Sequence, residues 1–220
     1  MKLNTLYLED CLELMSRMEG NFVDLIYLDP PFNSNRNYET PDGEVAFSDF
    51  WKWSKHCDSR YLKIKLDLDN PSRAALIGLF QILGQSSTMS YLFYMAERLV
   101  ECKRVLKDTG SIYLHCDSTS SHYLKVLMDA IFGNNNFRNE IIWYHPKMCS
   151  TESKFINSTD TILFYTMSNN YSFIVQRDEK QPNELFNRYK NKIRHHRLYY
   201  KEAKNIKDCL LYTSPSQRDS

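Results

Sequence analysis

An almost unbroken apolar run, Phe22-Val23-Asp24-Leu25-Ile26-Tyr27-Leu28, constrains the fold of this chain more than any other segment. Such runs are typical of strands that are buried on both faces of a parallel sheet. The run ends at Asp29-Pro30-Pro31, where two prolines lack the backbone donors that a longer ladder would need. We therefore expect a parallel strand with Asp29 at its carboxyl end, where open α/β sheets bind their ligands.

Periodic segments on either side of this run predict an α/β domain whose mostly parallel sheet ends in an antiparallel pair of strands. The expected elements, in chain order, are a strand at 6–8, a helix from 11 to 20, the strand at 22–28, a helix from 90 to 108–110, a strand at 111–116, a helix from 118–121 to 133, and strands at 140–144 and 161–165. The last two strands follow each other without a helix between them, so they should pair antiparallel. Residues 33–87 are expected to form a long excursion with short helical pieces, in which Trp51 and Trp53 either anchor the segment to the core or stack on bases.

Composition limits the class of protein. With 220 residues, of which 42% are hydrophobic and 25% charged, the chain can form one domain with a sizeable core. It has no apolar run near the ~20 residues that a membrane span needs and no signal peptide, so a soluble, cytoplasmic protein is expected. The six cysteines form no CxxC pair and no ligand spacing with histidine, which favours reduced thiols over disulfides or a metal site.

Charged residues are distributed unevenly along the chain, and the few glycines are dispersed. Residues 1–176 carry 17 basic and 21 acidic side chains, whereas residues 177–207 carry ten basic and four acidic ones. The basic stretch either contacts phosphates or is simply a solvated face. None of the six glycines lies within two residues of another, so the chain contains no Gly-rich loop of the kind that cradles phosphates or nucleotides.

Asp29-Pro30-Pro31-Phe32 suits attack by an exocyclic amino nitrogen on an activated methyl group. Asp29 can accept a hydrogen bond from one N–H and the Pro30 carbonyl from the other, which favours the tetrahedral, partly positive nitrogen of the transition state. Phe32 offers a ring for stacking on a base that has left the duplex. An Asp-Pro-Pro sequence alone is also a common strand-terminating turn, so the surrounding sequence has to decide between a catalytic motif and such a turn.

That context resembles the amino-methylating DNA methyltransferases of the permuted group, which include adenine-specific methylases and the modification subunits of type III restriction–modification systems. The resemblance covers most of residues 4–175 in the family's order. It is carried by the segments 4–10, 23–34, 104–107, 110–117, 137–143 and 160–165. It implies a Rossmann-like methyltransferase fold, S-adenosylmethionine as cofactor, double-stranded DNA as substrate, and a restriction subunit or a second copy of the chain as possible partner.

The resemblance also implies roles for individual residues. Asp29 to Phe32 match the catalytic motif, and Asp10 matches an acidic residue that faces the cofactor, with capping of the following helix as the alternative. Asp117 matches an acidic strand-end position, for which helix capping is the simpler role, and His115 is interpreted as a packed strand residue. The expected DNA contacts lie partly in the excursion, where loop solvation is the alternative, and partly in the basic stretch: Asn33, Arg36, Tyr38, Arg188, Lys190, Lys192 and Arg194.

The chain departs from the family in its second half. No glycine follows Gly133, so the family's F-x-G-x-G-type cofactor loop is absent, and residues 209–220 have the character of a non-native tail. We therefore expect residues 1–175 to form the catalytic half, 176–208 to begin a target-recognition region, and the fold to be incomplete at its C-terminus. A chain of this kind would not methylate DNA by itself.

Three functions remain open at this point. Asp29 together with Phe32 favours methylation of adenine N6, whereas enzymes that methylate cytosine N4 more often carry Ser at the first position. Glutamine-methylating relatives would carry Asn there. The third possibility is a non-catalytic DNA-binding module that lacks the cofactor loop.

Overall fold

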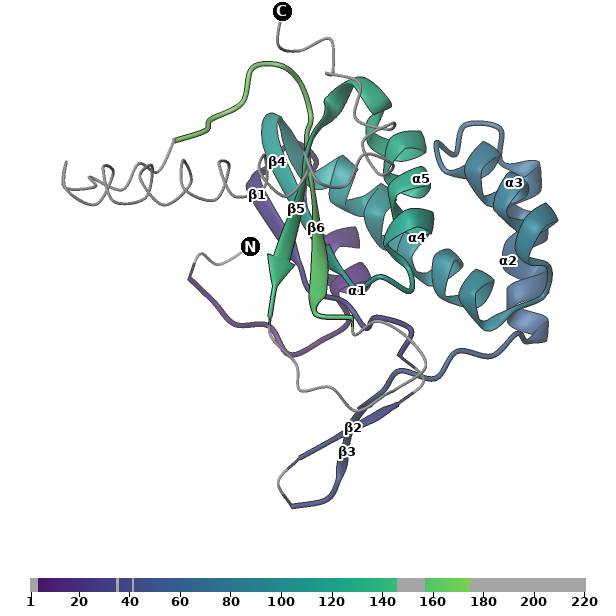
Figure 1. Ribbon diagram of the computed structural model, residues 1–220. Coiled ribbons are helices and arrows are strands. Elements are labelled where there is room, and N and C mark those ends of the chain that lie inside the picture. The colour runs from purple at the N-terminus through teal and green to yellow at the C-terminus, as the bar shows by residue number, and fades with distance from the viewer. Residues whose placement is uncertain (1–3, 35, 41, 146–156, 175–220) are drawn as a thin grey trace, which may run out of the picture. The chain divides into compact units, whose positions relative to one another are not determined.

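The structure is a computed structural model that describes residues 4–34, 36–40, 42–145 and 157–174 (Figure 1). The chain divides into a unit of residues 1–172 and a second unit of residues 173–220, and the description below concerns the first. Its elements are α1 (Cys11–Ser16), β1 (Val23–Leu28), β2 (Asn37–Glu39), β3 (Val45–Ser48), α2 (Lys55–Leu66), α3 (Arg73–Leu83), α4 (Ser87–Val105), β4 (Leu106–Cys116), α5 (Ser121–Phe132), a 3₁₀ turn (Asn134–Asn136), β5 (Phe137–Tyr144) and β6 (Thr159–Thr166).

The main sheet has four strands in the order β1-β4-β6-β5. β1 and β4 are parallel, with Leu28 opposite Leu114, which confirms the parallel pairing. The expected burial of β1 on both faces is wrong, because β1 is at the edge of the described sheet and Leu25 and Tyr27 are 57% and 52% exposed. β6 lies between β4 and β5 and is antiparallel to both, so the antiparallel pairing of the last two strands is confirmed. β6 is the more buried of the two strands and has the central position, where Leu163 and Tyr165 are almost fully buried.

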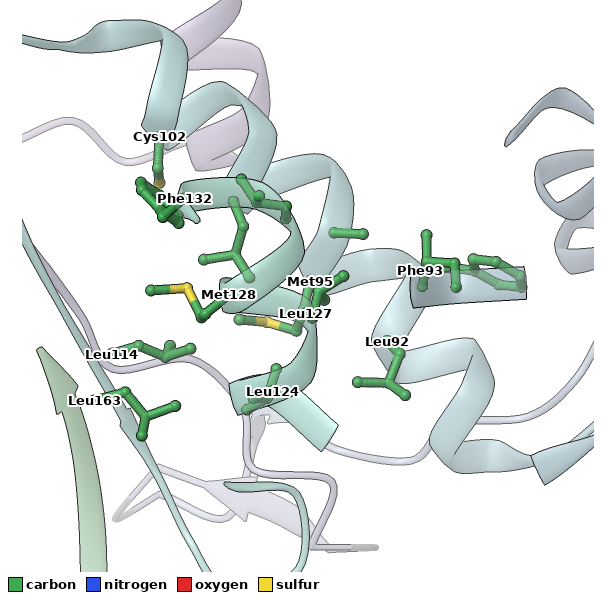
Figure 2. Close-up of a cluster of buried hydrophobic side chains, with 14 of the residues drawn as sticks. Leu92, Phe93, Met95, Cys102, Leu114, Leu124, Leu127, Met128, Phe132 and Leu163 are labelled. Carbon is green, nitrogen blue, oxygen red and sulfur yellow. The ribbon is translucent and has the colours of Figure 1, made fainter. Parts of the chain in front are cut away.

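Helices cover one face of this sheet (Figure 1). Leu114 and Leu163 from the strands and Leu124, Leu127 and Met128 from α5 are almost fully buried in one hydrophobic cluster (Figure 2). α4 contributes further side chains to the same cluster, including Leu92 and Met95, so the helix that carries much of the sequence's apolar periodicity forms the centre of the core. No helix in the described part of the chain is long and apolar enough to cross a membrane.

The expected strand at residues 6–8 is wrong. Residues 6–8 form no strand, and the side chains of Leu6 and Leu8 are 96% and 102% exposed. A strand is stable only when a neighbour supplies its hydrogen bonds and an apolar face to pack on. In the described residues, β1 pairs with β4 alone, so the segment at 6–8 has no strand beside it.

The boundary between α4 and β4 also differs from the prediction. α4 ends at Val105 and β4 begins at once, whereas residues 108–110 were expected to end the helix. Gly110 lies instead at an irregularity in the pairing with β1, where a Cβ atom would approach the Lys107 carbonyl oxygen to 2.8 Å and the Val23 carbonyl oxygen to 3.2 Å. Its role is close backbone approach between two strands rather than helix termination.

The excursion at residues 33–87 is more regular than expected. It contains the antiparallel hairpin β2–β3 and the two helices α2 and α3. Its two tryptophans anchor it: Trp51 packs against Tyr91 and Tyr94 of α4, and the Trp53 ring lies 5.9 Å from that of Phe93. This contact pattern supports the anchoring alternative over base stacking for both rings.

Candidate active site

The Asp29-Pro30-Pro31-Phe32 loop lies at the carboxyl end of β1, as expected, and opens on a cavity of about 570 Å³. The cavity is lined by the loop, by the hairpin and by two aromatic residues of the core: Asp29, Pro30, Pro31, Phe32, Tyr38, Phe47, Ser48, Trp51 and Tyr94. Five of these side chains are aromatic, and Asp29 is the only charged residue among them. A planar, uncharged ring with polar edges fits such a lining.

A buried aspartate outside the predicted site fixes the loop. Asp49 follows β3 and is fully buried. Its carboxylate accepts hydrogen bonds from the backbone N–H groups of Phe32, Asn33 and Ser34 at 3.2, 3.1 and 2.7 Å. It accepts two more at 2.7 Å, from the Ser34 hydroxyl and the Trp51 indole. Burial by itself raises the pKa of Asp49, but these donors outweigh it, so the pKa lies below its usual value.

Asp49→Asn tests this arrangement. An amide would replace one acceptor oxygen with a donor that faces other donors, so we expect the free energy of unfolding to fall by about 2–3 kcal/mol at pH 7. Urea denaturation measures this loss, and the exposed hairpin residue Asp42, changed to Asn, is the matched control.

The lowered pKa of Asp49 also predicts how the stability of these variants depends on pH. Because the folded pKa of Asp49 is lowered, its contribution to stability is complete above the unfolded value of about 3.9 and is lost as the pH falls through the folded value. Wild type and Asp42→Asn should therefore lose more stability than Asp49→Asn when the pH is lowered from about 5 to 2. Parallel curves for all three proteins would contradict the role of Asp49.

Like Asp49, His115 belongs to the site although the sequence analysis did not predict it there. It is buried on β4, which agrees with its interpretation as a packed strand residue, and its Nδ1 lies 3.0 Å from Oδ1 of Asp29. The Phe32 ring lies edge-on to the imidazole, with 5.0 Å between ring centroids. The parallel register would have indicated this contact, because Leu28 is opposite Leu114 and the next residues along the two strands are Asp29 and His115.

Asp10 lies at the N-terminus of α1 and serves as its cap. Its Oδ1 accepts a hydrogen bond from the Leu12 N–H at 2.7 Å, which supports the capping alternative. Its other oxygen pairs with the buried Arg98 at 2.5 Å, and that guanidinium lies 3.3 Å above the Tyr94 ring, which lines the cavity. The cofactor role that the resemblance implies for Asp10 stays a prediction.

The predicted DNA contacts in the excursion divide into two groups. Asn33 is only 3% exposed and has a φ of 62°, which favours a role in the loop over contact with a substrate. Tyr38 is 39% exposed and stacks on Phe47 with 4.5 Å between centroids, so its ring reaches the cavity and the solvent. Arg36 is exposed, and its carbonyl accepts a hydrogen bond from the Asp49 N–H at 2.8 Å.

Other predicted positions have simpler outcomes. Asp117 accepts hydrogen bonds from the N–H and hydroxyl of Thr119 in the turn before α5, whereas the N-cap of α5 is Ser120, so the expected helix-capping role of the Asp117 side chain is wrong. Of the cysteines in the described ranges, Cys57, Cys102 and Cys116 are buried free thiols, and burial raises the pKa of the last two to about 12. No group of three or more potential metal ligands occurs in the described part of the chain.

The described residues do not include the basic stretch with Arg188, Lys190, Lys192 and Arg194 or the tail at 209–220.

Fold and site together define an α/β domain with a proline-fixed acidic loop at the carboxyl end of a parallel strand, next to an aromatic cavity. A sequence model of the DNA methylase family matches residues 23–219. The chain belongs to this family, which confirms the resemblance that its motifs carry.

Three relatives illustrate the family. The StyLTI Mod subunit of a type III restriction-modification enzyme from Salmonella typhimurium is 29% identical over 189 residues, which are 80% of this chain and 27% of that protein. The EcoP15I Mod subunit from Escherichia coli is 29% identical over 61% of this chain and 20% of its own length. The type II methyltransferase M.EcaI from Enterobacter cloacae is 28% identical over 75% and 28% of the two chains. This chain therefore spans between 20% and 28% of the length of these relatives.

Proposed function

We propose that this chain forms the catalytic part of a DNA methyltransferase that transfers a methyl group from S-adenosylmethionine to the N6 amino group of adenine. The observation that carries the proposal is the Asp29-Pro30-Pro31-Phe32 loop beside a cavity lined by aromatic rings. Membership in the DNA methylase family supports it. Double-stranded DNA is the proposed substrate, and the type III Mod relatives favour a restriction subunit as partner.

The loop would act on the amino nitrogen through two acceptors. Asp29 accepts one N–H of the target base and the Pro30 carbonyl accepts the other, which stabilises the positive charge that develops on nitrogen as the methyl group arrives. Pro30 and Pro31 hold the loop because their rings restrict φ. Asp49 fixes the following backbone, so the Phe32 ring stays in place to stack on the base. The proton that nitrogen loses after transfer can pass to water.

Two partly exposed carboxylates suit the cofactor's chemistry. S-adenosylmethionine carries positive charge and ribose hydroxyls, and supplies its methyl group from a sulfonium. Asp10 and Asp29 would hold it, since their side chains are 46% and 63% exposed and can contact a ligand while they keep their internal partners. Asp10 would stay fixed by Arg98, and Asp29 by His115.

The modified nucleoside tests the reaction. Duplex DNA treated with the protein expressed from the full reading frame and with methyl-labelled S-adenosylmethionine should yield N6-methyladenine after enzymatic digestion and chromatography. N4-methylcytosine as the main product would contradict the adenine assignment and support the cytosine alternative. DNA binding without any methyl transfer would support the non-catalytic alternative instead.

A further inference from the structure

His115 lies between two carboxylates on the face of the sheet opposite the helices. Its Nδ1 is 3.0 Å from Oδ1 of Asp29, and its Nε2 is 3.5 Å from Oδ2 of Asp160 on β6. The same oxygen of Asp160 is 3.0 Å from Nε2 of His145. The imidazole is enclosed by the rings of Phe32 and Trp143, at centroid distances of 5.0 and 5.5 Å. Two strands, β4 and β6, and the residues that follow β1 and β5 thus supply a row of neighbouring polar groups that ends at Asp29.

Hydrogen-bond chemistry determines which atom is the donor in the contact between His115 and Asp29. An ionised carboxylate only accepts hydrogen bonds, so the contact with Asp29 requires a proton on Nδ1 of His115. Nε2 is buried without a hydrogen-bond partner in the structure and points towards Asp160. Asp160 contacts His145 on its other side, and the one hydrogen bond of the His115 ring in the described structure runs from Nδ1 to Asp29.

We propose that His115 is a positioning residue for methyl transfer: it binds one oxygen of Asp29 and so holds the carboxylate where its exposed part meets the target amino group. This inference rests on the proposed function. Asp29 itself is 63% exposed, and nothing but a fixed partner stops such a side chain from turning away from the cavity. A displacement of about 1 Å at a reacting group can lower a rate by about 100-fold.

Two substitutions separate positioning from packing. In His115→Asn the amide nitrogen takes the place of Nδ1 and can still donate to Asp29, although the side chain is smaller. In His115→Gln the amide reaches towards Nε2 and Asp160, and the donor to Asp29 is lost although the volume is better preserved. Positioning therefore predicts that Asn is the better replacement, whereas packing alone predicts that Gln is.

Methyl transfer to duplex DNA by the protein from the full reading frame measures the difference. We expect kcat to fall by about 10- to 100-fold in His115→Gln and by less than about threefold in His115→Asn, with the KM for DNA within about twofold in both. His122→Gln, on the exposed face of α5, should match wild type. Equal activity of the two His115 variants, a more active Gln variant, or a change confined to KM would overturn the proposal.

The state of the ring provides a readout that does not depend on activity. In ¹⁵N spectra of the labelled chain, the His115 signal, assigned by its loss in His115→Asn, should show a proton on Nδ1, and Asp29→Asn should shift it. An unprotonated Nδ1 at pH 7.5 would overturn the positioning role. Absence of methyl transfer by wild type together with a protonated Nδ1 would instead refute the proposed function and leave the contact established.

Discussion

Asp29→Ala is expected to lower the rate of methyl transfer by about 100- to 1000-fold, because the proposed mechanism would lose one preorganised acceptor at the reacting nitrogen. Asp29 lies beyond the last residue of β1, with an exposed side chain that lines the cavity rather than the core. Folding and DNA binding should therefore change little. The measurement is single-turnover methyl transfer with saturating S-adenosylmethionine, alongside DNA binding at fixed salt.

Asp24→Ala is the matched control for this experiment. Asp24 is a second aspartate of the same chain segment, on β1, and its exposed side chain pairs with Lys107 at 2.7 Å, away from the cavity. An exposed ion pair of this kind contributes at most about 1 kcal/mol, so activity should stay near that of wild type. If Asp29→Ala retained more than half of the wild-type rate, Asp29 would not be the acceptor that the mechanism requires.

Leu114→Ala is expected to lower the free energy of unfolding by about 2–5 kcal/mol. Leu114 is fully buried on β4, where it packs in the cluster with Leu124, Leu127 and Leu163 (Figure 2). Truncation removes apolar contacts and leaves a cavity that the sheet and α5 cannot both close. The denaturation midpoint should fall while the dependence of stability on denaturant stays the same.

Leu66→Ala controls for the substitution itself. Leu66 ends α2 and is 79% exposed, so its loss should change stability by no more than about 0.5 kcal/mol. Similar losses in the two variants would mean that Leu114 does not lie in the core described here. Because Leu114 is opposite Leu28, the variant also tests whether the strand that precedes the Asp29–Phe32 loop depends on this core.

The loop at residues 29–32 depends on residues outside its own motif. The motif itself spans four residues, but two residues distant in sequence hold it: Asp49 binds its backbone and His115 binds its carboxylate. Each controls a different part of the loop, so substitutions at the two positions should have different effects. Loss of Asp49 should act mainly on stability, whereas loss of the His115 donor should act mainly on kcat.

Local sequence patterns determined much of this protein. The run at residues 22–28 predicted β1, the period around Leu124 and Leu127 predicted α5, and the two apolar stretches without a helix between them predicted the antiparallel pair β5 and β6. The position of the Asp29–Phe32 loop at the end of β1 followed from the same reasoning, because Pro30 and Pro31 have no N–H to donate to a strand ladder. Such features depend on residues that are close in the chain, and their periodicity is visible in the sequence.

Only the tertiary structure decided which strands have neighbours and what holds the loop. Leu6 to Leu8 are apolar, as expected of a strand, but no strand of the described residues lies beside them, and β6 rather than β5 pairs with β4. The donors to Asp49 come from residues up to 17 positions away, and Asp29 and His115 are separated by 86. No periodicity encodes contacts over such distances, because they depend on strand order and register, which are set by the burial of the whole sheet against its helices.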